Sequence, residues 1–259
     1  MEYFVHKNSI VRRIWGKSDT VLFIFAGAAA EFSLNKAVDW LYFTGKLPKD
    51  PLGRLFSTVT YARKIIFSKN EEALKIIDSI FMIHKNVEAN RGKSIPSWAY
   101  RDVLYMLIHY SIASFELLER KLSPAEKEEV YDVFFRFGSR MKLGGLAANY
   151  PDWLFQREMD MQNDLEKSAL SIDLFKQYRK HLGSFRYFLL VEAQKLLVPF
   201  KVRKLLGFSK YSIITPMLPI YKLSKRLGWD EWLKRVLLPK KYKKEISELD
   251  VIKYYKILA

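Results

Sequence analysis

The stretch DPLGRLFSTVTYARKIIF, residues 50–67, predicts an α-helix whose pattern recurs along the chain. Asp50 supplies an N-cap carboxylate, and the proline after it takes the first helical position, where its missing N–H costs no hydrogen bond. Arg54, Thr58 and Tyr61 recur at i, i+4 and i+7, so they share one face of this helix. A guanidinium and a hydroxyl on one face indicate a pocket for a polar or anionic group, because an apolar core does not need them.

Helical spacing continues over most of the sequence. Apolar residues recur at helical intervals in residues 70–90, 97–121 and 171–197. Ser123, followed three positions later by Glu126, is the signature of a capping box. The chain shows no sustained apolar/polar alternation and no Asn-Gly or Asp-Gly hairpin turn. The sequence therefore predicts an all-α protein of roughly ten helices.

The length and composition predict one domain. A chain of 259 residues with 49% hydrophobic content can bury one large core. Short loops and the lack of repeats predict a single globular domain over residues 1–259, with a basic C-terminal portion from about residue 199 that packs on it or faces a membrane. The chain has no cysteine, which excludes disulfides, thiolate metal sites and cysteine nucleophiles.

The longest uncharged apolar run is TVLFIFAGAAA, residues 20–30. It is too short for a transmembrane helix, which needs about 20 apolar residues. The run predicts a buried helix, and Gly27 with its neighbouring alanines leaves room for another backbone or a flat cofactor to approach. The N-terminal segment lacks the apolar core of a signal peptide. These features predict a cytoplasmic protein.

The net charge of +16 is concentrated near the C-terminus. Residues 176–256 contain 20 Lys and Arg against 6 Asp and Glu, a net charge of +14. Large apolar residues are interleaved with these cations, namely Phe200, Leu205, Leu206, Phe208, Ile220, Tyr221, Leu223, Trp229, Trp232, Leu237 and Leu238. This mixture is typical of a surface that binds an anionic membrane from one side, so we expect peripheral binding at the inner membrane face. No nucleic-acid partner is expected, because the chain lacks the usual binding motifs.

Two of the four histidines lie in apolar surroundings. His84 shares a helix face with apolar residues, namely Ile77, Ile80, Phe81 and Val87. His109 lies within the apolar run YMLIHYSIASF, residues 105–115. A buried histidine needs a partner, so each of them either hydrogen-bonds a backbone carbonyl or ligates a metal. His6 and His181 are expected in solvent.

The order of these residues resembles a known family. Asp-Pro-x-x-Arg-x-x-x-Thr-x-x-Tyr, then Ile-His-x-x-Val at 83–87, then a long helix bearing His109 and Ser114, resembles the MpaB-like oxygenases, which include the latex-clearing proteins, or rubber oxygenases. The likeness extends over residues 15–119, less than half of the chain. The family is all-helical and binds haem b in a buried pocket. The resemblance implies that His84 is the proximal iron ligand.

The resemblance also assigns the surrounding residues. Arg54 and Thr58 would line the haem pocket and take part in catalysis, with Tyr61 and His109 also at the cofactor. Rubber oxygenases carry a distal Lys just before the Thr, where this chain has Ser57, so the sixth iron position would be open or filled by water, and an open position suits O2 binding.

Rubber oxygenases also use an upstream Glu as a proposed base. The nearest acids here are Glu31 and Asp39, which are the candidate catalytic carboxylates although neither has the expected spacing. The implied reaction is O2-dependent oxidation or cleavage of a C=C bond in a hydrophobic, lipid or isoprenoid-like substrate.

Two other functions remain open from the sequence. One is a non-haem iron enzyme that uses His84, His109 and a carboxylate from Glu88, Glu31 or Asp102 as a facial triad. The other is a non-enzymatic, basic membrane-surface protein, which needs only the C-terminal charge and leaves the Arg54 face unexplained.

Overall fold

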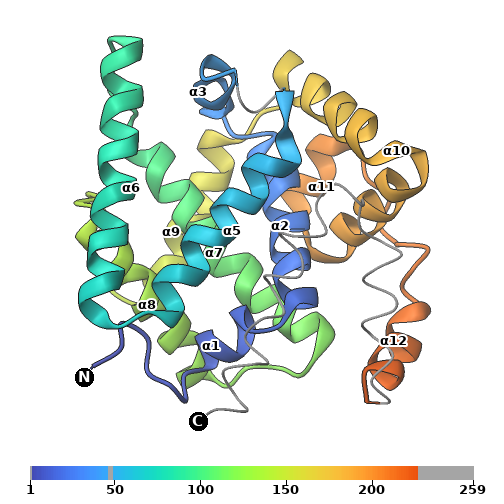
Figure 1. Ribbon diagram of the computed structural model, residues 1–259. Coiled ribbons are helices and arrows are strands. Elements are labelled where there is room, and N and C mark those ends of the chain that lie inside the picture. The colour runs from blue at the N-terminus through green and yellow to red at the C-terminus, as the bar shows by residue number, and fades with distance from the viewer. Residues whose placement is uncertain (1, 46–48, 227–259) are drawn as a thin grey trace.

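The computed structural model in Figure 1 describes residues 2–45 and 49–226. Within these ranges the chain forms eleven α-helices and no strand beyond two isolated bridges, which confirms the prediction of a single all-α domain. The helices are α1 (Ile10–Trp15), α2 (Ser18–Phe32), α3 (Val38–Phe43), α5 (Pro51–Phe67), α6 (Asn70–Arg91), α7 (Ser97–Leu118), α8 (Pro124–Arg140), α9 (Tyr150–Asp164), α10 (Ala169–Leu197), α11 (Phe200–Leu206) and α12 (Met217–Arg226).

The predicted helix starts are present at α5 and α8. The Asp50 carboxylate accepts a hydrogen bond from the Gly53 backbone N–H at 3.1 Å. Ser123 and Glu126 form both bonds of the capping box at the start of α8. These contacts satisfy backbone N–H groups that have no partner inside a helix, which explains why both helices begin where the sequence predicts.

The helix predicted over residues 20–30 is α2, and it packs against α7 in the middle of the molecule (Figure 1). A Cβ atom added at Gly27 would lie 2.2 Å from Cδ1 of Tyr110 on α7. Only glycine lets the two helices approach this closely. Of the two possibilities for the small residues, a neighbouring helix or a flat cofactor, the structure places a neighbouring helix against Gly27.

One main core joins α1, α2 and the helices from α5 to α9. Trp15 is fully buried there and donates its indole N–H to the hydroxyl of Ser111 at 3.1 Å. A smaller core links the ends of α2 and α9 to α11, and its buried members are Ala30, Leu34, Met161, Leu165, Val198 and Val202. None of the described helices is both long and apolar enough to cross a membrane.

The helices α5 and α6 are joined by Ser68 and Lys69 and run in opposite directions, with α6 at one edge of the molecule and α5 between α6 and α2 (Figure 1). The helix α12 lies at the opposite edge. This arrangement places the Arg54 face of α5 toward α6, the helix that carries His84.

Candidate functional site

Arg54 projects from α5 into a partly buried position and is held there by its own helix. Its Nη1 donates to the hydroxyls of Ser57 at 3.2 Å and Thr58 at 3.1 Å. Both hydroxyls in turn donate to the Arg54 carbonyl, at 2.8 and 3.2 Å respectively. Burial lowers the pKa of Arg54. Within the described ranges no carboxylate pairs with this guanidinium, so the site offers a positive charge in need of an anion.

His84 lies on α6 across from Arg54 and is partly buried. Its Nδ1 is 2.9 Å from the carbonyl of Ile80, one turn earlier. A proton on Nδ1 makes this hydrogen bond, which leaves the lone pair of Nε2 free to bind a metal. Burial, and after it the charge of Arg54, lower the pKa of His84 and outweigh the Ile80 bond, so the imidazole is neutral at pH 7. Among the described residues, Nε2 has no hydrogen-bond partner.

Tyr100 packs against the His84 ring and is itself bonded to Glu88. The Tyr100 ring packs edge-on against His84, with ring centroids 5.2 Å apart. Its hydroxyl donates to Oε1 of Glu88 at 3.1 Å, and the same oxygen accepts from the Ile95 N–H at 3.0 Å. Lys85 pairs with the other carboxylate oxygen of Glu88. Sequence reasoning missed Tyr100 and named Glu88 only as a possible metal ligand, although its spacing of four residues from His84 placed both on one face.

Two other residues expected at this site, Tyr61 and Asp39, make no hydrogen bond to Arg54 or His84 among the described residues. Tyr61 is on the same face of α5 but is 37% exposed. Asp39 pairs with Arg91 at 2.7 Å, and this guanidinium stacks on the ring of Trp40, 4.0 Å from its centroid. No contact among the described residues links Asp39 to Arg54 or His84.

Glu31 is buried in an ion pair inside the helix bundle. Its Oε2 accepts from Arg157 at 2.7 Å and from the Tyr110 hydroxyl at 2.8 Å. Glu31 is 1% exposed and Arg157 is 4% exposed. The pair is separated by 126 positions in sequence, so no local pattern could have revealed it. We therefore assign Glu31 a structural role, as the counter-ion of the buried Arg157.

His109 belongs to the same buried region rather than to the His84 site. Its ring packs against Tyr110, with centroids 4.8 Å apart, and it hydrogen-bonds the backbone of Leu197. Burial, and after it the charge of Arg157, hold the pKa of His109 well below its usual range. Its Nε2 is buried with no hydrogen-bond partner in the protein.

The facial triad of His84, His109 and a carboxylate is not assembled. Among the described residues, the one group of three potential ligands with atoms within 4.8 Å of one another is Asp102, Asp160 and Asp164. Arg101 forks onto Asp160 with bonds of 3.1 and 2.9 Å, and Asn35 donates to Asp102 at 2.7 Å. Burial, together with the charges of Asp164 and Asp160, raises the pKa of Asp102 to about 7. Protonation of Asp102 therefore lowers the negative charge of this group of three carboxylates.

The raised pKa of Asp102 predicts a specific pH dependence. The folded protein keeps a proton on Asp102 that the unfolded chain releases above about pH 4, so this carboxyl stabilises the fold at low pH and the effect is lost as pH rises through 7. Asp102→Asn should gain about 2 kcal/mol relative to wild type between pH 5 and 8. Urea unfolding of both proteins across this range measures the difference, and a pH-independent difference would contradict the assignment.

Comparison with known families identifies the family of the chain. The family described as ER-bound oxygenase mpaB/B'/Rubber oxygenase, catalytic domain, matches residues 12–237. The match includes both Arg54 and His84 and extends well beyond the region of likeness visible in the sequence motifs. No curated protein and no solved structure matches the chain. Because the match covers most of the chain, the protein belongs to the family of the ER-bound mpaB/B' and rubber oxygenase catalytic domains.

Proposed function

We propose that this oxygenase depends on haem b and that Nε2 of His84 is the axial ligand of the iron. The observation that carries the proposal is the state of His84: Nδ1 is committed to the Ile80 carbonyl, and Nε2 has no partner among the described residues. A haem-ligating histidine needs this tautomer and a fixed ring. Tyr100 supports the second requirement through its edge-on contact. When bound, the haem supplies the redox-active iron at which O2 reacts.

The Arg54 guanidinium fits the other end of such a cofactor. A haem carries two propionate carboxylates, and arginine matches a carboxylate with two parallel N–H bonds. Arg54 uses Nη1 on Ser57 and Thr58, and no carboxylate of the described chain competes for the rest of its fork. We assign Ser57 and Thr58 the role of holding Arg54 in place, since each hydroxyl bridges the guanidinium and the Arg54 carbonyl.

The small Ser57 side chain supports an open position for O2. The rubber oxygenases that the chain resembles carry a lysine there, and a serine hydroxyl is too short to take over its role as an iron ligand. For the substrate, the family supports a hydrophobic molecule together with O2. Cleavage of one C=C bond by one O2 gives two carbonyl groups and balances without an external reductant. We therefore propose a lipid or isoprenoid-like alkene as the substrate class.

Substitution of Arg54 by lysine tests the propionate contact. Lys keeps the charge but cannot form the fork, so we expect Arg54→Lys to release haem about tenfold faster while the helical content stays unchanged. Transfer of haem to apomyoglobin measures the rate. Arg140→Lys is the matched control, because Arg140 forks onto Asp78 at the surface. If Arg54→Lys lowers only the melting temperature and both variants release haem at the wild-type rate, the contact is disproved.

A further inference from the structure

The chain from α11 to α12 exposes large apolar side chains that no described residue covers. The exposed fractions are 75% for Tyr211, 72% for Ile213, 59% for Met217, 68% for Ile220 and 58% for Leu223. The last three recur at i, i+3 and i+6 and so share one face of α12. We call Tyr211, Ile213, Met217, Ile220 and Leu223, together with Lys210 and Lys222, the α12 surface.

The α12 surface is anchored to the domain by polar contacts on its inner side. The Ser212 hydroxyl and the Ile213 N–H both bond Oε2 of Glu192, at 2.9 and 2.7 Å. The Tyr221 hydroxyl donates to Asp19 on α2 at 2.8 Å. Just before this surface, Leu205, Leu206 and Phe208 pack against the smaller core and are only partly exposed. The remaining apolar side chains are therefore held outward.

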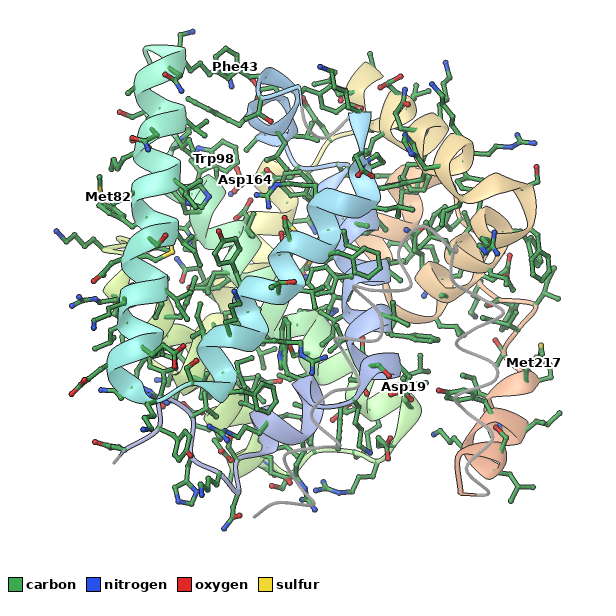
Figure 2. All side chains as sticks on the ribbon, in the orientation of Figure 1. Asp19, Phe43, Met82, Trp98, Asp164 and Met217 are labelled. Atoms are coloured by element: carbon green, nitrogen blue, oxygen red, sulfur yellow. The ribbon has the colours of Figure 1, made fainter. Side chains whose placement is uncertain are left out.

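The charge around this surface has one sign. Residues 193–226 contain eight Lys and Arg and no Asp or Glu. Within the described part of the chain, Lys204, Lys210 and Lys222 form no salt bridge. Figure 2 shows Met217 at the edge of the molecule opposite Met82 of α6. Cations without counter-ions beside outward apolar side chains match the chemistry of an anionic lipid headgroup layer over acyl chains.

We propose that the α12 surface docks the protein on an anionic bilayer, with Met217, Ile220 and Leu223 entering the interface and Lys210 and Lys222 contacting headgroups. Charge favours this partner over a second copy of the chain, because two such surfaces repel each other. The outward apolar face of α12 favours it over a nucleic acid, whose exterior is phosphate. The docking does not require haem, so its test is independent of the test of the proposed oxygenase chemistry.

The test is flotation of the full chain with vesicles of phosphatidylcholine alone or mixed with phosphatidylglycerol, from about 0.05 to about 0.5 M salt. Wild type should float with the mixed vesicles at low salt only. Each surface cation contributes about fivefold, so combined Lys210→Gln and Lys222→Gln should weaken binding at least tenfold. Combined Ile213→Ser, Ile220→Ser and Leu223→Ser should also weaken it, through lost insertion of apolar side chains.

Matched controls remove the same groups elsewhere. Lys64→Gln and Lys75→Gln on the α5–α6 side remove two charges, and Met82→Ser with Phe155→Ser removes side chains that are 55% and 74% exposed. These variants should bind like wild type. The proposal is overturned if wild type does not float with mixed vesicles at low salt, or if control and surface variants lose binding equally. It is also overturned if the surface variants only dissociate a dimer seen by ultracentrifugation.

Discussion

His84→Ala is expected to purify with less than about a tenth of the wild-type haem while keeping the wild-type helical content. The substitution removes the only imidazole placed opposite Arg54 within the described ranges. The fold should survive, since the ring is only partly buried and, among the described residues, its one hydrogen bond is to the Ile80 carbonyl. Absorption spectra and haem content by pyridine haemochrome assay measure the loss, and circular dichroism reports the fold.

Two controls distinguish a ligand from a packing residue. His6→Ala and His181→Ala should keep wild-type haem, because neither histidine lies at the Arg54 site. A His84→Gly variant supplied with free imidazole should recover haem, since the added ring can occupy the vacated space. If His84→Ala keeps its haem, or if His109→Ala loses haem with native helical content, the assigned axial ligand is wrong.

Glu31→Ala is expected to destabilise the protein by roughly 3–5 kcal/mol, the usual result of leaving one member of a buried ion pair alone. Arg157 would remain buried, with its Nε already lacking a partner, and the Tyr110 hydroxyl would lose its acceptor. Domains of this kind unfold with only about 5–15 kcal/mol, so the loss is a large part of the total. Urea unfolding of the apo-protein measures it without any contribution from a cofactor.

Replacing Glu31, Tyr110 and Arg157 together by apolar residues distinguishes a structural role of Glu31 from a catalytic one. Glu31→Leu combined with Tyr110→Phe and Arg157→Met removes every charge and hydroxyl of this contact, and should restore stability to within about 2 kcal/mol of wild type. A structural Glu31 predicts that this triple variant still binds haem. If Glu31→Ala unfolds at the wild-type urea concentration but has lost turnover, Glu31 acts as the catalytic carboxylate and the structural account is contradicted.

The parts of the fold that could be predicted rest on local physics. Asp50 and Ser123 begin their helices as expected because capping involves residues three positions apart. The apolar run at residues 20–30 forms α2 because its composition leaves no polar face. The resemblance to a known family predicted that Arg54 and His84 lie at one site. Periodicity alone could not have shown that their two helices pack together.

The buried polar contacts could not be predicted in the same way. Glu31 and His109 each looked like a candidate for chemistry, but Glu31 pairs with Arg157, and His109 lies near Arg157 and bonds Leu197 at the end of α10. Their roles are set by which helices pack together. Trp229 and Leu237, expected on the basic surface, lie outside the described residues, as do Trp232 and Leu238.

The absorption spectrum and metal content of the wild-type protein, purified from cells supplied with haem, test the central claim most directly. The account predicts a Soret band, about one haem and one iron per chain, and a shift of the band when imidazole competes at the iron. A colourless protein that does not take up added hemin would contradict the account. Iron bound without porphyrin would instead favour a non-haem site. Among the described residues, His84 and His109 do not belong to one group of potential metal ligands.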